Sequence, residues 1–482
     1  MKVLFATSEA HPLAKTGGLA DVSGALPAAL RALGTDVRVL MPGYPAALDK
    51  TKKLARLFRL DLPGHGETTL LQGTFPDSGV PVYFIEHAGY YARAGLYQDK
   101  SGQDWPDNAM RFGLLSRAAA LLASTQSPLD FRPDVLHCND WQTGLAPAYL
   151  HFHQSRPTPS VFTIHNLAYQ GVFPPDTLPR LGLPQESFSI NGVEYYGNLS
   201  FLKAGLFYAR HLTTVSPTYA REIQTEAFGM GMQGLLAGRS RDLTGILNGI
   251  DTREWNPLSD PHLPARYGAA NFTGKAACKR ALRSELNLAQ LPQTPLLGMV
   301  SRLTHQKGTD VVLEAVPQLL ELGVQFAVLG GGDAVLEARW RALAAAYPER
   351  IAVAIGYNEA LAHRIEAGAD IFLMPSRFEP CGLNQMYSQR YGTPPLVHKV
   401  GGLADTVVHA SPENLANGTA TGFVIERLDS GTLVAALRDA SALYRKRTAW
   451  KKLMQNGMKR DFAWSGSARH YQDVYKKICS AK

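Results

Sequence analysis

The sequence has no uninterrupted apolar stretch of about 18 residues, the length that a membrane-spanning helix needs. Its N-terminal apolar run, residues 3–7, is too short for a signal peptide. Cysteine is also scarce: the four thiols show no C-x-x-C pair and no zinc-ligand spacing, and they stand far apart at Cys138, Cys278, Cys381 and Cys479. These absences argue against a membrane protein and a disulfide scaffold, and they predict a chain that works in the reducing cytoplasm.

A strong charge of either sign is missing too, because the net charge is only +8 over 482 residues. A nucleic-acid-binding protein usually gathers its lysines and arginines in one stripe. Here they are dispersed, and the densest runs, residues 445–447 and 451–452, are typical of a solvated helix face. A nucleic-acid partner is therefore not expected, whereas a modest basic balance suits an enzyme that handles diphosphates and a neutral polymer.

Short apolar runs and helix-like stretches alternate along the whole chain. Before residue 250 the runs cover residues 3–7, 37–41, 80–85, 135–138, 160–165, 212–215 and 243–247. After it they cover residues 296–301, 326–329, 351–355, 371–375, 395–398 and 423–425. Short apolar strands joined by helices predict parallel sheets covered on both faces. Two such series, in a chain too long for one compact domain, predict two Rossmann-like domains.

The boundary between the two series is expected near Asn248 and Gly249. This turn-prone pair is followed by a segment rich in proline and aspartate, residues 255–264, that has no clear periodicity. We place the first domain at residues 1–248 and a hinge directly after it.

A glycine-rich loop stands near the N-terminus, at Lys15-Thr16-Gly17-Gly18. Glycines before a helix let backbone N–H groups approach an anion, the helix dipole attracts it, and Lys15 adds a full charge. A similar sequence, Lys399-Val400-Gly401-Gly402, stands near the other end of the chain. The two loops are either one related loop per domain, facing each other across a cleft, or a coincidence of a few residues.

A second cluster, residues 301–308, joins an apolar run to a helix-like stretch and contains Arg302 and Lys307. Both cations fall at the carboxyl end of a strand, which is where open α/β sheets bind ligands. At an effective dielectric near 20, each charge pair in contact contributes about 4 kcal/mol. That is enough to hold a diphosphate and to stabilise it as a leaving group. An exposed basic loop that binds nothing is the alternative.

The third cluster, residues 375–385, again joins a predicted strand to a predicted helix. Its carboxylate, Glu379, is suited to hold sugar hydroxyls. The amides of Gly382 to Asn384, at the start of the helix, are suited to a phosphate. The alternative is a capped helix with a solvated glutamate.

Taken together, the loop at residues 15–21 and the clusters at 301–308 and 377–383 resemble the bacterial glycogen synthase and plant starch synthase family. Residues 134–141, 163–171 and 248–251 resemble further motifs of the same family. The match runs from residue 1 to about residue 480, in order and with compatible gaps. The K-T-G-G-L start combined with F-E-P-C-G-L makes the resemblance specific.

The resemblance implies an α/β protein of the GT-B fold, with two Rossmann-like domains that face each other across a deep cleft and close around the substrates. It implies a second domain at residues 249–458 and a C-terminal helix, residues 459–482, that crosses back to the first. The implied reaction transfers glucose, with retention, from ADP-glucose to the non-reducing end of an α-1,4-glucan such as glycogen or a malto-oligosaccharide. Neither a nucleic acid nor a membrane is an expected partner.

Residue roles also follow from the resemblance. The implied catalytic residues are Lys15, Asp140, His165, Arg302, Lys307 and Glu379. The implied substrate-binding residues are Gly17, Gly18, Asp21, Asn248, Tyr357, Cys381, Gly382, Leu383 and Asn384. The cations face the diphosphate, Glu379 and His165 contact hydroxyls of the donor glucose, and Tyr357 stacks near the adenine. Outside this motif, His165 would be taken as a structural histidine and Asp140 as a helix cap; Cys381 is either a reactive thiol or a small packing residue.

The chain departs from many transferases of this fold at Tyr387, where they carry a second glutamate for the ribose, and Asn384 stands where many family members have threonine. No D-x-D pair occurs, so no metal and no cofactor are expected, and Lys15, Arg302 and Lys307 are expected to neutralise the diphosphate. No well-placed nucleophilic carboxylate is evident either, which favours front-face attack without a covalent intermediate.

Three other functions remain open on these residues. A sucrose or trehalose synthase of the same fold would keep Arg302, Lys307 and Glu379. A nucleotide-sugar epimerase would share the architecture but would not extend a glucan. A silent glucan-binding scaffold would bind glucan without releasing ADP.

Overall fold

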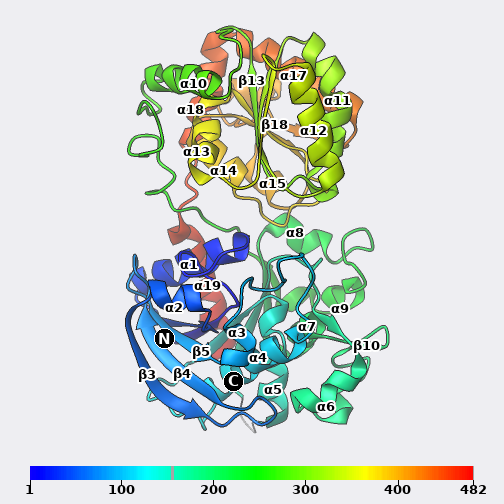
Figure 1. Cartoon of the computed structure of the whole chain (residues 1–482). Coiled ribbons are helices and arrows are strands. Elements are labelled where there is room, and N and C mark those ends of the chain that lie inside the picture. Colours follow the sequence, from blue (N-terminus) through cyan, green and yellow to red (C-terminus); the bar gives the residue numbers. More distant parts are fainter. Residues whose placement is uncertain (154–156, 481–482) are drawn as a thin grey trace. The chain divides into compact units, whose positions relative to one another are not determined.

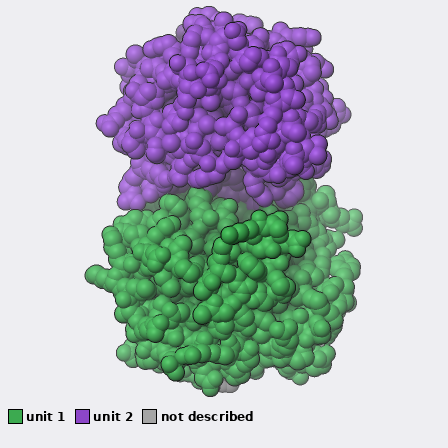
Figure 2. All heavy atoms as spheres, in the orientation of Figure 1, with its two compact units in different colours: residues 1–249, 464–482 green, residues 250–463 purple. Residues whose placement is uncertain are grey.

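A computed structural model describes residues 1–153 and 157–480 of the chain. The chain folds as two compact units, one of residues 1–249 with 464–482 and the other of residues 250–463 (Figures 1 and 2). The chain therefore passes from one unit to the other twice, after Gly249 and after Ala463. None of the helices in the described ranges combines the length and the apolar character that crossing a membrane would take.

The first unit is built on a sheet of nine strands, counted over its described residues, in the order β12-β11-β7-β6-β1-β2-β5-β4-β3. Their bounds are β1 (Lys2–Ala6), β2 (Asp36–Pro42), β3 (Lys52–Leu60), β4 (Thr68–Thr74), β5 (Pro81–Glu86), β6 (Val135–Asn139), β7 (Ser160–Ile164), β11 (His211–Thr214) and β12 (Leu243–Gly245). From β12 to β5, neighbouring strands are parallel. Because β6 and β7 are buried at every residue, they stand out as short runs in the sequence.

The helices of this unit connect and cover the strands (Figure 1). They are α1 (Gly18–Ala32), α2 (Pro45–Lys50), α3 (Ala88–Tyr91), α4 (Asn108–Leu122), α5 (Leu145–His153), α6 (Leu178–Leu181), α7 (Phe201–Tyr208), α8 (Pro217–Glu222), α9 (Gln233–Gly238) and α19 (Trp464–Ser480). Although α19 comes from the far end of the chain, it packs here. The Tyr475 hydroxyl lies 2.7 Å from His137 Nδ1, and Gln472 Nε2 donates to Thr35 Oγ1 over 2.8 Å.

The prediction of parallel sheets covered on both faces fails at one edge of this unit. Strand β3 pairs antiparallel with β4, and β4 antiparallel with β5. Most residues of β3 are exposed, so charged and apolar residues mix in it and it leaves no apolar run to detect. A small antiparallel sheet, of β8 (Val172–Phe173), β10 (Asn198–Ser200) and β9 (Glu194–Tyr195), was also missed, because each strand has only two or three residues.

The second unit, all of whose residues are described, has a six-stranded parallel sheet in the order β15-β14-β13-β16-β17-β18. The strands are β13 (Leu296–Val300), β14 (Gln325–Gly330), β15 (Ile351–Ile355), β16 (Ile371–Met374), β17 (Pro395–His398) and β18 (Phe423–Ile425). The helices are α10 (Thr273–Glu285), α11 (Thr309–Glu321), α12 (Ala334–Ala346), α13 (Glu359–Gly368), α14 (Asn384–Arg390), α15 (Gly401–Thr406), α16 (Pro412–Ala416), α17 (Ser430–Arg445) and α18 (Arg447–Met458).

Both faces of this sheet are buried, and successive residues of a strand alternate between them. Phe326 and Val328 of β14 pack in a core that α11, α12 and α17 also line. Ala327 and Leu329 of the same strand pack in a second core with side chains of α13. Parallel strands buried on both faces are nearly all apolar, which is why this sheet was visible in the sequence.

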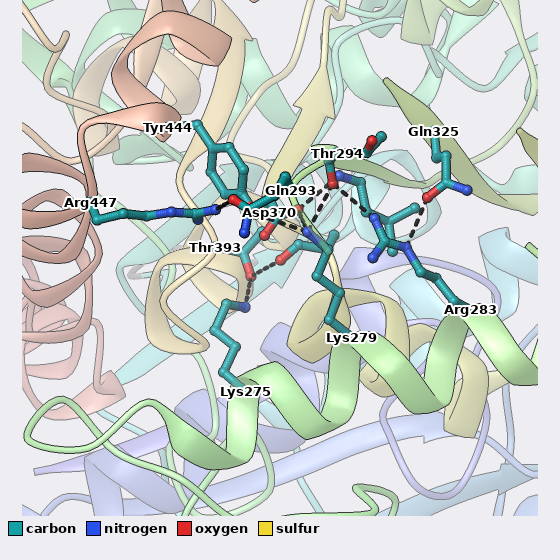
Figure 3. A network of polar contacts seen from close by, with 12 residues as sticks. Lys275, Lys279, Arg283, Gln293, Thr294, Gln325, Asp370, Thr393, Tyr444 and Arg447 are labelled. Atoms are coloured by element: carbon teal, nitrogen blue, oxygen red, sulfur yellow. Dashed lines mark hydrogen bonds and ion pairs between the residues drawn. The ribbon is translucent and has the colours of Figure 1, made fainter. Parts of the chain in front are cut away.

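A buried polar network ties α10 to the end of the sheet where β13 begins (Figure 3). Three cations of α10, spaced one turn apart, point into it. Lys279 Nζ lies 2.5 Å from Asp370 Oδ2, Lys275 Nζ donates to Thr393 Oγ1 over 2.6 Å, and Arg283 Nε donates to Gln325 Oε1 over 2.8 Å. Burial lowers the pKa of Lys275 to about 8. Asp370 is the carboxylate that compensates this buried positive charge, so it is expected to matter for stability.

Candidate active site

In the first unit, the glycine-rich loop directly precedes α1, as predicted. Gly17 and Gly18 are exposed, and a Cβ added to either one would meet no described atom within 4 Å. Packing within this unit therefore does not demand glycine at these positions. What glycine provides instead is bare backbone at a helix N-terminus, where an anion or a sugar can approach closely.

The two charged residues predicted for this loop bind each other. Lys15 Nζ lies 2.6 Å from Asp21 Oδ1, and both side chains are partly exposed. An ion pair of this kind contributes little to stability because water screens it. Lys15 is therefore held near the loop by a partner that a phosphate can replace.

Sequence reasoning missed Glu9, which follows β1 and fixes the glycine-rich loop. Its Oε2 accepts hydrogen bonds from the backbone N–H of Thr16, at 2.5 Å, and from the Thr16 hydroxyl, at 2.9 Å. Burial raises the pKa of Glu9, although these hydrogen bonds act in the opposite direction. The available signal was its place just beyond the carboxyl end of a central strand, where such sheets bind ligands.

Asp140 and His165 follow two neighbouring strands, β6 and β7, and contact each other. Asp140 has a φ of +55°, a strained value for a residue with a side chain, and its Oδ1 accepts the His165 backbone N–H over 2.7 Å. Burial raises the pKa of Asp140 to about 7. The aspartate therefore shapes the backbone that carries His165, and it is only partly ionised at neutral pH.

The His165 imidazole is neutral, because burial lowers its pKa to about 3. Its Nε2 lies 2.9 Å from Asn139 Oδ1, and Asn139 Nδ2 donates to the carbonyl of Ala6 over 3.0 Å. Since that second bond orients the amide, Nε2 must carry the proton of the ring. Nδ1 is left as a hydrogen-bond acceptor, which suits a sugar hydroxyl better than it suits proton donation.

Asn248 stands directly before Gly249, after which the chain leaves the first unit, and the sequence predicted a hinge near these residues. Its side chain is buried, and no hydrogen-bond donor in the described parts of the chain reaches its Oδ1. A buried acceptor of this kind is normally paired, so this position is suited to a polar ligand.

In the second unit, the structure brings Lys307 and Glu379 together. Lys307 follows β13 and Glu379 follows β16, which is its neighbour in the sheet. Lys307 Nζ lies 2.5 Å from Glu379 Oε2, and the Ser376 hydroxyl donates to the same oxygen over 3.0 Å. The cation predicted for phosphate and the carboxylate predicted for sugar thus stand side by side. Arg302, after the same strand as Lys307, is exposed and bonds Gln306 Oε1 at 3.3 Å.

Two further contacts hold this loop in place, and neither was predicted. Arg377 binds Asp310 with both terminal nitrogens, each bond 2.7 Å long. Gly401 and Gly402 pack against the loop so closely that an added Cβ would lie 1.9 Å from the carbonyl oxygen of Glu379 and 2.1 Å from that of Cys381. The second K-x-G-G loop therefore needs its glycines for packing inside its own unit, whereas those of the first loop are open.

The remaining predicted residues of this unit lie on or near the same edge of the sheet. Gly382 has a φ of +71°, which favours glycine, and Leu383 caps α14. Asn384 opens α14 and donates to the carbonyl of Val300 over 2.7 Å. Cys381 is buried, as a packing residue would be, and Tyr357 is 78% exposed just beyond β15. Nothing in these positions by itself assigns them to a ligand.

Tyr387, which stands where related transferases carry a second glutamate, is part of an aromatic stack. Its ring lies 3.7 Å from that of Trp255 at 8°, and the other face of Trp255 lies 3.8 Å from His363 at 14°. The place of the carboxylate is thus taken by a packed ring.

The two Rossmann-like units are those of a glycosyltransferase of the GT-B fold, as matches to known proteins show. Residues 2–238 match the family model of the starch synthase catalytic domain, and residues 287–456 match that of glycosyl transferases group 1. The chain is 55% identical to a glycogen synthase of Nitrosomonas eutropha (99% of this chain, 96% of the relative) and 56% identical to one of Aromatoleum aromaticum (100% and 98%).

The fold agrees with these matches. The catalytic domain of starch synthase IV from Arabidopsis thaliana, solved with ADP and acarbose, superposes with a TM-score of 0.89 at 33% identity and covers 99% of both chains. The chain belongs to the glycogen and starch synthase family.

Proposed function

We propose that this protein transfers glucose from ADP-glucose to the non-reducing end of an α-1,4-glucan, with retention at the anomeric carbon. The contact between Lys307 and Glu379 carries this proposal, because a cation suited to a phosphate and a carboxylate suited to sugar hydroxyls meet after neighbouring strands. The glycogen synthases that the chain resembles, and the starch synthase solved with ADP and acarbose, support the choice of donor and acceptor.

The cations supply the electrostatic part of the reaction. Lys307 and Arg302 in the second unit, and Lys15 in the first, neutralise the diphosphate and stabilise the charge that grows as the sugar–phosphate bond breaks. Lys15 and Lys307 each bind a carboxylate in the free protein, at 2.6 and 2.5 Å. Donor phosphates therefore compete with Asp21 and Glu379 for them. In this scheme the transfer requires no metal ion.

The geometry of the first unit favours front-face attack over a covalent intermediate. A nucleophilic carboxylate would have to be ionised and aimed at the sugar, whereas the Asp140 carboxyl accepts a backbone N–H and has a pKa raised by burial to about 7. His165 is neutral, and its Nδ1 accepts a hydrogen bond from a sugar hydroxyl. The bond from the anomeric carbon to the phosphate oxygen breaks, the bond to the acceptor O4 forms, and the departing phosphate oxygen takes the proton of the 4-hydroxyl.

A donor and acceptor screen tests this proposal. ADP release and incorporation of labelled glucose are measured with ADP-glucose or UDP-glucose, on glycogen, fructose 6-phosphate or glucose 6-phosphate. We expect glucan extension with ADP-glucose. Transfer only to a sugar phosphate would indicate a sucrose- or trehalose-type synthase, and glucan binding without ADP release would indicate a scaffold. We also propose that the protein is located in the cytoplasm, in keeping with four cysteines that form no disulfide.

A further inference from the structure

Three side chains of the second unit gather outside the groups used above. Glu254, Glu359 and His363 each bring a potential metal-ligand atom to within 4.8 Å of the other two. Glu359 and His363 lie one turn apart at the start of α13, so they project from the same face of the helix. Glu254 comes from the loop that begins at Ile250, shortly after the boundary between the units.

The His363 ring is held in one orientation with one nitrogen unused. Its Nδ1 lies 2.7 Å from Asp260 Oδ2, and the ring of Trp255 stacks on it at 3.8 Å. The side chain is buried, and Nε2 has no hydrogen-bond partner anywhere in the described residues. A carboxylate that fixes Nδ1 while Nε2 presents its lone pair is the usual arrangement of a metal-binding histidine. Left unpaired, such a buried nitrogen is costly.

The arginines beside two of these residues bind other carboxylates. Arg253, next to Glu254, lies 3.1 Å from Asp251 Oδ2, and Arg364, next to His363, lies 2.6 Å from Glu285 Oε1. Two acidic groups thus stand together beside a histidine lone pair, and the cations of neighbouring residues are engaged elsewhere.

We propose that Glu254, Glu359 and His363 bind a divalent transition-metal ion of the zinc class. One imidazole and two carboxylates suit Zn²⁺ or Co²⁺, whereas Mg²⁺ and Ca²⁺ prefer oxygen ligands alone. Zinc ligands lie about 2.0–2.2 Å from the metal, and therefore about 3.4 Å from one another in a tetrahedron. The two glutamates are not buried, so they reach that spacing by small side-chain movements. Three protein ligands leave the fourth position to water.

Such an ion would tie the loop after the unit boundary to α13. By fixing Glu359, it would also fix the hydrogen-bond acceptor of Tyr357, whose hydroxyl donates to Glu359 Oε2 over 3.0 Å. This site is separate from the phosphate-binding cations, because Lys307 follows β13 and Glu359 follows β15, two strands away in the sheet. If no metal ion binds at this site, the proposal for the transfer reaction is unaffected.

Binding of Co²⁺ and Zn²⁺ to the full-length protein, freed of any affinity tag, tests the site. We expect one ion per chain by equilibrium dialysis, and visible absorption bands of four-coordinate Co²⁺ that Zn²⁺ displaces. Asp260→Asn weakens the affinity about 10–100-fold, as loss of an outer-sphere partner does. Glu254→Gln and Glu359→Gln weaken it more, since each removes a ligand.

Glu285→Gln is the matched control, because Glu285 binds Arg364 of α13 but lies outside the cluster. It should bind Co²⁺ like the unmodified protein. The two glutamates that carry the test are not buried, so their variants are expected to fold, which circular dichroism checks. Absence of binding at micromolar Zn²⁺ would overturn the proposal. So would affinities that Glu254→Gln and Glu359→Gln leave unchanged, since the ion would then lie elsewhere.

Discussion

Replacing Lys307 by alanine should remove most of the activity of a folded protein. The side chains of Lys307 and Glu379 are 18% and 7% exposed, so water screens their surroundings weakly. At an effective dielectric near 20, two unit charges about 4 Å apart interact by about 4 kcal/mol. If Lys307 makes one such contact with the departing phosphate, its loss lowers kcat/KM for the donor about 1,000-fold, at about 1.36 kcal/mol per tenfold.

A control variant separates this effect from the loss of any lysine. Lys399 lies 2.8 Å from Glu426 in the same unit, but the two side chains are 53% and 76% exposed. Lys399→Ala removes an ion pair of similar length that contributes at most about 1 kcal/mol. Its kcat/KM, measured by ADP release on a glycogen primer, should stay close to that of the unmodified protein.

Stability has to be followed in the same experiment, because Lys307→Ala leaves a buried carboxylate without its cation. Breaking a buried pair costs about 3–5 kcal/mol. The double variant Lys307→Met, Glu379→Gln removes both charges and should regain part of that stability while activity stays low. A folded Lys307→Ala protein whose kcat/KM lies within tenfold of the unmodified value would refute the phosphate-binding role.

Four further predictions follow from the structure. Glu379→Ala should reduce kcat severely while ADP still binds in calorimetry; parallel loss of ADP affinity would assign Glu379 to the nucleotide. Because burial raises the pKa of Asp140 to about 7, the folded state takes up a proton there below pH 7 and stability falls as the pH rises from about 4 to 7. In urea unfolding, the free energy of unfolding of Asp140→Asn, relative to that of the unmodified protein, should therefore rise by up to about 1.4 kcal/mol per pH unit in that window. A difference in free energy that does not depend on pH would contradict this. Gly17→Ala should keep the melting temperature and lose activity, whereas Gly401→Ala should lower the melting temperature, because its Cβ would lie 1.9 Å from a carbonyl oxygen; equal thermal shifts would argue against an open loop. Asp370→Asn should lower the free energy of unfolding, measured by chemical denaturation, by about 3–5 kcal/mol. Glu285→Gln, which breaks a more exposed ion pair, should lower it by less than about 1 kcal/mol. A similarly small loss for Asp370→Asn would mean that the α10 lysines find other partners.

The parts of the fold that could be predicted are those whose burial requires a recognisable run of apolar residues in the sequence. The six strands of the second unit are short, parallel and covered on both faces, so each appears as an apolar run followed by a helix. Strand β3 failed this test because its residues are mostly exposed, and nothing in a mixed sequence separates an exposed strand from a loop.

In the candidate site, too, local features could be predicted from the sequence, whereas contacts between distant residues could not. Lys307 and Glu379 were each predicted, from local motifs and from the resemblance to a known family. Their contact was not, because it joins residues far apart in the chain through the crossover that places β16 beside β13. Glu9 was missed, since a single glutamate after a strand carries no spacing signal. Its role rests on hydrogen bonds to Thr16 that only coordinates reveal.

The K-x-G-G pair shows how one sequence pattern can have two physical causes. In both places glycines stand at the start of a helix, which begins at Gly18 in α1 and at Gly401 in α15. An added Cβ meets no described atom at Gly17 and meets a carbonyl oxygen at Gly401. The first loop thus leaves backbone free for a ligand, and the second uses glycine to pack against the Glu379 loop. Sequence alone gave no means to tell these causes apart.

The central claim, elongation of an α-1,4-glucan from ADP-glucose, is tested most directly by following the label in the product. Malto-oligosaccharide is extended with ADP-[¹⁴C]glucose, released ADP is quantified, and the product is digested with β-amylase, which removes maltose from non-reducing α-1,4 ends. The account predicts one ADP per glucose incorporated and release of the label as maltose. ADP release without incorporation, or label that resists digestion, would contradict it.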